Sequence, residues 1–395
     1  MKKTKRMVSI LVVVIMVLML AACNSGGGSG SGSSTTGPIL IGHTVALTGA
    51  SALWGQSERN ALEMEIDRIN AAGGVLGRQL KLISYDNQTL PAEAVNVANR
   101  LVEDGVTVVI GPAQSGTARA SSYVYEENKI PMVATTATNE LVTVPEGATE
   151  PLEFIFRTCF IDPYQGAVAA VFALNDLGTK KAGILQDVGS DYSTFLAKNF
   201  TDRYVAGGGT IVAHESFRSE ELEYKAQLAK IKDSGAEVLF IPTQQKEAGL
   251  AMKQAAELGM SMYYLGGDGW GSVELVELGG AATEGSFFVD LASLEDPVLA
   301  EWAKQYTDKF GINPVMPNPV MAVDALRGLV AAMEATKSTD GTAIAKWFST
   351  CKDVPVLSGK LTMDPNTHNP IGKAAVINTV KNGEFVFYAG IPSAI

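Results

Sequence analysis

Short apolar runs alternate with longer segments of helical periodicity along most of the chain. Ile39–Leu47 is extended and rich in apolar residues, which predicts a strand. The segment Gly55–Ala71 places Leu62, Ile66 and Ile69 on one face of a helix. Repeated strand and helix units of this size predict an α/β fold, in which a parallel sheet carries helices on both faces.

The alternation runs in two similar series, separated by a change of composition at Pro145–Pro151. In each series a helix ends in a glycine cluster, Gly73-Gly74 or Gly207-Gly208-Gly209, and a strand follows at once. Three further helices are expected after the second series, and the end reads as a hairpin turning at Asn382-Gly383. These late elements need a sheet to pack on. We therefore expect two similar α/β lobes, with a chain that crosses between them more than once.

The N-terminus has the pattern of an export signal. A positive segment precedes the uncharged apolar run Met7–Leu20, which is too short for a lasting membrane span. The sequence Leu20-Ala21-Ala22-Cys23 resembles the bacterial lipobox, whose cysteine is lipidated and becomes the first residue of the mature protein. The alternative is a simple signal peptide with an incidental Cys23. We expect residues 1–22 to be the signal and residues 23–37, rich in Gly, Ser and Thr, to be a flexible tether. The domain would then work outside the cytoplasm, beside a membrane.

The charge balance is acidic. The 395 residues include 31 Lys and Arg against 42 Asp and Glu, a net charge of −11. Removing residues 1–22 takes away four positive charges and leaves −15. This balance argues against nucleic acid as a partner and against an electrostatic membrane-binding face.

Motifs for catalysis and metal binding are missing from the sequence. There is no Gly-x-Ser-x-Gly, no phosphate-binding loop and no Cys-x-x-Cys, and the three His lack metal spacing. We therefore expect no enzyme activity, no cofactor and no metal. Cys159 and Cys351 are left either as a disulfide or as two buried thiols.

One junction carries a possible anion site. The β-branched run at the start of Val106–Thr117 predicts a strand, which Gly111 and Pro112 end before a helix begins. In open α/β sheets ligands bind at such junctions, where free N–H groups at a helix start attract a carboxylate. The junction could also be a plain connection.

Several motifs together resemble one family. They are Ile41-Gly42, Leu47-Thr48-Gly49, Trp54-Gly55, Ile69-Asn70-Ala71-Ala72-Gly73-Gly74-Val75-Leu76-Gly77-Arg78, Tyr85-Asp86, Val109-Ile110-Gly111-Pro112 with Ser115, Ile130-Pro131, Phe156-Arg157-Thr158, Gln165-Gly166 and Asp191-Tyr192. With these motifs, residues 38–395 resemble the branched-chain amino-acid (Leu/Ile/Val-type) solute-binding proteins of ABC importers. The resemblance implies the type I periplasmic-binding-protein fold, in which a three-crossover hinge joins two Rossmann-like lobes with parallel sheets. We expect lobe 1 at residues 38–158 plus 288–357 and lobe 2 at residues 159–287 plus 358–395.

The resemblance also implies a ligand site for an amino acid. Ser115 and Thr138, with backbone groups around Ala137, match the family's carboxylate site, and Thr136 is the rival of Thr138. Asp268 falls where family members place an ammonium-binding acid. Trp54 and Tyr192 match positions that flank the ligand, and Gln244 stands where leucine-type proteins have a Tyr.

Each of these residues has a plainer interpretation. Ser115 could be only a helix N-cap, Tyr192 could simply cap a helix start, and Asp268 could be a turn residue. Trp54 could simply pack. The chain also departs from its relatives at Val323-Asp324-Ala325, where many of them have a Tyr before Asp-Ala. Because Gln donates and accepts hydrogen bonds, Gln244 predicts a more polar pocket than one for leucine.

The resemblance therefore predicts an extracytoplasmic binding protein that captures an amino acid and delivers it to ABC permease subunits, as a monomer. The alternative is a ligand-sensing receptor for an amide, a short carboxylate or an aromatic acid, without transport.

Overall fold

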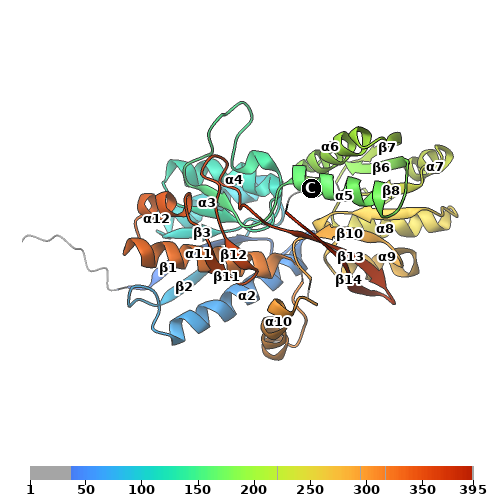
Figure 1. Ribbon diagram of the computed structural model, residues 1–395. Coiled ribbons are helices and arrows are strands. Elements are labelled where there is room, and N and C mark those ends of the chain that lie inside the picture. The colour runs from blue at the N-terminus through green and yellow to red at the C-terminus, as the bar shows by residue number, and fades with distance from the viewer. Residues whose placement is uncertain (1–36, 220, 294, 316, 394–395) are drawn as a thin grey trace, which may run out of the picture. The chain divides into compact units, whose positions relative to one another are not determined.

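A computed structural model describes residues 37–219, 221–293, 295–315 and 317–393 (Figure 1). The predicted signal, Cys23 and the tether up to residue 36 lie outside the described residues, so the predictions made for them stay predictions. No helix in these described ranges is long and apolar enough to cross a membrane.

Within the described residues, one sheet consists of five parallel strands. Their spatial order is β2 (Leu80–Asp86), β1 (Ile39–Val45), β3 (Val108–Ile110), β4 (Met132–Ala134) and β5 (Ile155–Arg157). The elements between them are α2 (Ala52–Ala71), α3 (Pro91–Glu103), α4 (Ser115–Glu127) and η1 (Glu140–Val142).

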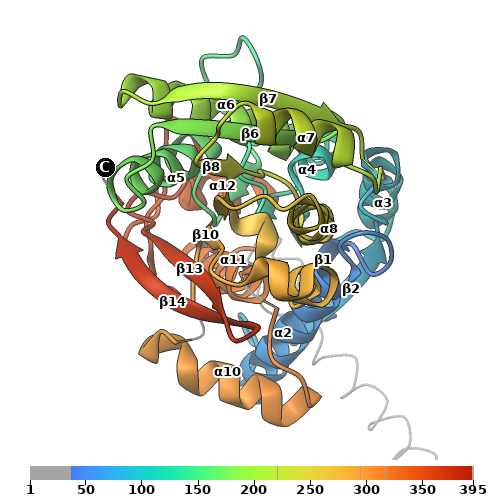
Figure 2. The ribbon, with the colours of Figure 1, turned by 90° about the vertical axis from the view of Figure 1, so that its right-hand side faces the viewer.

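A second sheet has seven strands among the described residues. Their order is β14 (Glu384–Ile391), β13 (Ala375–Lys381), β10 (Phe287–Asp290), β9 (Tyr263–Gly266), β8 (Val238–Phe240), β6 (Lys181–Asp187) and β7 (Thr210–Phe217). Its helices are α5 (Asp162–Asn175), α6 (Asp191–Ala206), α7 (Lys225–Asp233), α8 (Gln245–Glu257), η2 (Asp268–Trp270), α9 (Glu274–Gly279) and η3 (Gly280–Thr283). The β13–β14 hairpin pairs antiparallel along the edge beside β10 (Figure 2).

The two sheets repeat one topology. The order β2-β1-β3-β4-β5 in the first sheet corresponds to β7-β6-β8-β9-β10 in the second, strand by strand. In both sheets the first strand in sequence pairs with the second and third in parallel. This repeat confirms the prediction of two similar α/β lobes. We call the part around the five-stranded sheet lobe 1 and the part around the seven-stranded sheet lobe 2.

The chain passes between the lobes three times. It leaves lobe 1 after β5 and returns after β10, and its final passage follows a small two-stranded sheet (Figure 1). The elements on the return are α10 (Pro297–Phe310), α11 (Asn318–Thr336), α12 (Gly341–Phe348), β11 (Val354–Val356) and β12 (Gly359–Leu361). Because the whole of β10 belongs to the second sheet, the return follows Asp290, slightly later than the expected boundary after residue 287. The complete lobe boundaries stay a prediction.

Helices cover both faces of the first sheet, as expected. Along β3, Val108 and Ile110 belong to the apolar cluster that includes Leu62 of α2, while Val109 faces the cluster that includes Leu101 of α3. This alternation buries a strand on both sides, which explains its continuous apolar sequence. It also fixes the strand ends, and with them the loops that carry the candidate site.

Cys159 and Cys351 are both free thiols, and both are buried. Of the two alternatives left open by the sequence, the structure has the buried thiols. Burial raises the pKa of the Cys159 thiol to about 12, so this group is not a reactive thiolate.

Candidate functional site

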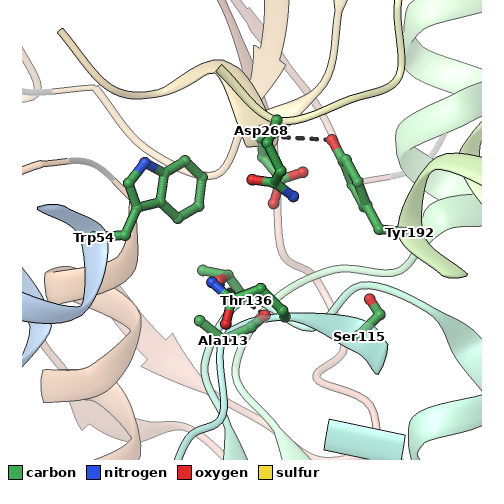
Figure 3. A pocket seen from close by; sticks show the side chains of 9 residues that line it. Trp54, Ala113, Ser115, Thr136, Tyr192 and Asp268 are labelled. Atoms are coloured by element: carbon green, nitrogen blue, oxygen red, sulfur yellow. Dashed lines mark hydrogen bonds between the residues drawn. The ribbon is translucent and has the colours of Figure 1, made fainter. Parts of the chain in front are cut away.

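A small cavity lies where loops of the two lobes meet (Figure 3). Its lining comes from both lobes: Trp54, Ala113, Gln114, Ser115 and Thr136 from lobe 1, and Tyr192, Gln244, Asp268 and Gly269 from lobe 2. The cavity volume is about 10 Å³, which is about enough for one water molecule. A larger groove of about 1240 Å³ adjoins it and shares several lining residues. The lobes are thus in contact around the cavity, and a solute would enter when they part.

The repeated topology places the lining residues in equivalent pairs. Thr136 follows the end of β4 by two residues, and Asp268 follows the end of β9 by two residues. Trp54 lies in the first turn of α2, and Tyr192 lies in the first turn of α6. Each pair therefore comes from the same kind of junction after a parallel strand, at the carboxyl ends of the strands, which is where open α/β sheets bind ligands.

Ser115 lines the cavity as the first residue of α4. The N-cap of this helix is Gln114, so the alternative that Ser115 is only an N-cap is wrong. Its hydroxyl oxygen accepts a hydrogen bond from the backbone N–H of Asn139 at 3.2 Å. The hydroxyl hydrogen is then free to donate into the cavity, beside the free N–H groups at the start of α4.

The loop after β4 presents Thr136 to the cavity rather than Thr138. The Thr136 hydroxyl lies 3.1 Å from Oδ1 of Asn318 and 3.3 Å from the carbonyl oxygen of Ala113. Thr138 is fully buried and outside the lining, and its carbonyl accepts a hydrogen bond from the N–H of Asp162 at 2.9 Å. The structure thus brings Ser115 together with the rival residue Thr136.

Ala137 also lies outside the cavity lining. It is fully buried, and its carbonyl oxygen accepts a hydrogen bond from Nη1 of the buried Arg157 at 2.6 Å. This contact fixes the loop between Thr136 and Thr138 from behind. Ala137 therefore supports the loop, and its role as a ligand contact stays an untested prediction.

Among the described residues that line the small cavity, Asp268 is the only one with an acidic side chain, and it is buried. Nε2 of Gln165 donates a hydrogen bond to its Oδ1 at 2.8 Å. Burial raises the pKa of Asp268 to about 6, although hydrogen bonds from Gln165 and Tyr192 act in the opposite direction. A buried carboxyl that faces a cavity, with no basic side chain in the lining, is suited to pair with a cation.

Trp54 and Tyr192 lie on opposite sides of the cavity (Figure 3). The Trp54 ring comes from lobe 1 and is 3% exposed. The Tyr192 hydroxyl accepts a hydrogen bond from the N–H of Gly269 at 3.1 Å, drawn as a dashed line in Figure 3. Because Ser190 is the N-cap of α6, Tyr192 is not a capping residue. The two rings form the aromatic walls of the cavity.

Sequence reasoning selected Gln244 and missed its counterpart Gln114. Both side chains line the cavity. Both are N-cap residues, Gln114 of α4 and Gln244 of α8. Aligning Pro112-Ala113-Gln114 with Pro242-Thr243-Gln244 in the two series would have identified Gln114.

Polar contacts join the lobes beside the cavity, and one of them runs from Nδ2 of Asn139 to the carbonyl oxygen of Asp191 at 3.4 Å. Nη1 of Arg119 in α4 lies 2.6 Å from Oδ2 of Asp191 in α6. Nε2 of Gln245 donates to the carbonyl oxygen of Ala50 at 3.4 Å. Because each contact spans the two lobes, parting the lobes would break them.

Across the described ranges, no group of three or more His, Cys, Asp or Glu side chains is arranged to hold a metal ion. The polar side-chain groups of the described lining residues are hydroxyls, carboxamides, one carboxyl and the buried indole N–H of Trp54. Such a set can form hydrogen bonds with a small zwitterion, with donors on one side and an acid on the other.

Comparison with known proteins agrees with this geometry. Residues 38–384 match the family described as periplasmic binding protein. A Leu/Ile/Val-binding protein homolog of Brucella melitensis is 32% identical over 82% of this chain and 86% of its own length. The Leu/Ile/Val-binding protein BraC3 of Rhizobium johnstonii is 31% identical over 82% of this chain and 87% of its own length.

Solved structures give the same result. The leucine-binding protein LivK of Thermotoga maritima superposes with a TM-score of 0.82 at 32% identity, covering 89% of this chain and 98% of that one. LivJ of Streptococcus pneumoniae, solved in complex with isoleucine, has a TM-score of 0.82 at 27% identity and covers 90% of this chain and 99% of that one. The chain belongs to the periplasmic binding protein family, with the two-lobed type I fold.

Proposed function

We propose that this protein is the solute-binding component of an ABC importer and that it captures an amino acid between its two lobes. The observation that carries the proposal is the position of Asp268. Its buried carboxyl faces the cavity from lobe 2, while the hydroxyls of Ser115 and Thr136 face it from lobe 1 (Figure 3). Relatives at 31–32% identity that carry the name Leu/Ile/Val-binding protein support an amino acid as the solute.

The two sides of the cavity suit the two ends of an amino acid. The Ser115 hydroxyl and the free N–H groups of α4 would donate hydrogen bonds to the carboxylate, and the Thr136 hydroxyl would add another by turning its hydrogen away from Ala113 and Asn318. Ionised Asp268 would accept hydrogen bonds from the ammonium group. Because these groups come from different lobes, the solute completes its contacts only when the lobes close, and closure excludes water from the ion pair.

The proposal extends to where the protein works. The sequence Leu20-Ala21-Ala22-Cys23 supports export and lipidation at Cys23, which would hold the binding domain at the outer surface of the cell membrane. The polar tether after Cys23 would let the domain reach its permease subunits. We propose that it does so as a monomer and that the solute leaves unchanged.

A binding experiment with matched analogues tests this proposal. The full-length chain, kept soluble in a mild detergent, is screened by thermal shift and calorimetry against the L-amino acids. For each amino acid that binds, the analogue without the ammonium and the analogue without the carboxylate are measured as well. We expect the zwitterion to raise the melting temperature by mass action and both analogues to lose that effect. If no amino acid binds, or if the carboxylic acid alone binds as tightly, the proposal is wrong.

A further inference from the structure

Gln114 and Gln244 occupy topologically equivalent positions, one in each lobe. Gln114 lies between β3 and α4, and Gln244 lies between β8 and α8. Both residues are N-caps in extended conformation, and neither side chain forms a capping hydrogen bond. A Gln side chain that is not used for capping is free to serve another partner. Both line the same cavity, so the site contains two carboxamides.

The side-chain oxygens of this pair lack partners. Oε1 of Gln114 and Oε1 of Gln244 are each buried with no hydrogen-bond partner among the described residues. Leaving a buried acceptor unsatisfied destabilises a protein, and most such groups in native proteins are paired. Two unsatisfied acceptors from equivalent positions, at one cavity, indicate a shared partner that donates hydrogen bonds.

The remaining lining limits the charge of that partner. Apart from Asp268, the lining residues that the structure describes include no acidic side chain and no Lys, Arg or His. Asp268 is assigned to the ammonium group, and Ser115 and Thr136 are assigned to the carboxylate. The two amides and the Trp54 ring are left for the solute's side chain. Amides pair well with a neutral group that both donates and accepts, and the ring provides an apolar wall.

We infer that the preferred solute is an amino acid with a short, neutral, hydrogen-bonding side chain that carries a hydroxyl or a carboxamide. This inference rests on the proposed function, because it concerns only the side chain of an amino acid whose ammonium and carboxylate groups are already assigned. A hydrocarbon side chain would fill the same space and leave both amide oxygens unpaired. A site built to bond a polar group discriminates strongly against the isostere that lacks it.

Isosteric pairs of amino acids test the inference. Threonine and valine differ by a hydroxyl in place of a methyl, and asparagine and leucine differ by a carboxamide in place of a branched alkyl end. We expect calorimetry on the full-length chain in mild detergent to show at least one polar member binding about tenfold or more tighter than its isostere. Binding of the hydrocarbon members with equal or greater affinity would overturn the inference and leave the proposed function intact. Binding of no amino acid at all would instead overturn the proposed function.

Two variants test the role of the glutamine pair. Gln114→Met and Gln244→Met keep an unbranched side chain of similar length and remove the amide. We expect each variant to reduce the preference for the polar isostere, and the double variant to abolish it. Gln305→Met, on an exposed face of α10, is the matched control and should change nothing. The melting curve of the double variant checks that it is folded. If the folded double variant still prefers the polar isostere as strongly as the native chain does, the amides do not set the specificity.

Discussion

Nε2 of Gln165 donates a hydrogen bond to Oδ1 of Asp268 over 2.8 Å, and both side chains are buried. Gln165 lies in α5 and Asp268 begins η2, so the contact joins two elements of lobe 2 behind the cavity. A neutral amide holds the carboxyl in place without neutralising it. The charge of Asp268 is therefore left for the solute.

Affinity for an amino acid should depend on the ionisation of Asp268. Its pKa is raised to about 6 by burial, so most of the free protein carries a neutral Asp268 at pH 5. The ammonium of the solute remains charged between pH 5 and 7. We predict that affinity rises about tenfold from pH 5 to pH 7, with proton release on binding near pH 6. Calorimetry in buffers of different ionisation enthalpy measures both effects. A flat profile would show that Asp268 does not pair with the ammonium.

Asp268 should also affect the free energy of unfolding of the protein when no solute is bound. Its pKa rises from about 3.8 to about 6 on folding, so the folded state is favoured while the group is protonated. This contribution is present below about pH 4 and is lost as pH rises through about 6, at a cost of about 3 kcal/mol. We predict that Asp268→Asn, which is neutral at every pH, gains stability relative to the native chain between pH 4 and pH 7. Denaturant unfolding of the variant and the native chain at pH 4 and at pH 7 measures this gain. If the two proteins differ in free energy of unfolding by the same amount at both pH values, the prediction is wrong.

The hydroxyls of Ser115 and Thr136 should contribute more to the affinity for an amino acid than the hydroxyl of Thr138. Ser115 and Thr136 line the cavity, whereas Thr138 does not. We predict that Ser115→Ala and Thr136→Val each weaken binding of an amino acid by roughly 1–3 kcal/mol, because a charged carboxylate loses a donor. Thr138→Val, the matched control, should change affinity by less than either. Calorimetry measures the affinity of each variant. A larger loss of affinity for Thr138→Val than for Thr136→Val would support Thr138 as the carboxylate contact, as first predicted from the sequence.

The Arg119–Asp191 ion pair should favour the closed arrangement of the lobes. Its atoms are 2.6 Å apart, but the side chains are 32% and 40% exposed. Exposed pairs contribute at most about 1 kcal/mol. We therefore predict that Arg119→Gln and Asp191→Asn each weaken binding a few-fold, mainly through faster release, and that the double variant is no worse. Lys198→Gln, in an exposed pair within α6, is the control. Additive losses in stopped-flow release rates would show that the two residues do not act as a pair.

Much of the fold could be predicted from periodicity. The sequence pattern predicts a helix over Pro297–Phe310 and a strand over Thr210–Phe217. The structure has both elements with these bounds, because proline and glycine signals mark their ends. Sequence patterns did not predict the short hairpin of β11 and β12 or the six-residue helix α9. Such short elements bury too few residues to show a periodic pattern of apolar residues in the sequence. Their formation depends on tertiary contacts.

The site was harder to predict than the fold. Ser115, Asp268, Trp54, Tyr192 and Gln244 were selected through family resemblance, and all line the cavity. The resemblance favoured Thr138 over Thr136, because a two-residue shift in a run of similar residues leaves no mark in a single sequence. Gln114 was missed, because an N-cap glutamine carries no signal in the sequence until the fold places it at the same cavity as Gln244.

The most direct test of the account is the affinity of the Asp268→Asn variant for the amino acid that binds the native chain most tightly. Asp290→Asn, which removes another buried acid of lobe 2 outside the cavity lining, is the control for burial. We predict that calorimetry at pH 7 shows a loss of about 2–5 kcal/mol for Asp268→Asn and little loss for Asp290→Asn. Unchanged affinity in a folded Asp268→Asn variant would contradict the claim that this cavity binds an amino acid through its ammonium group.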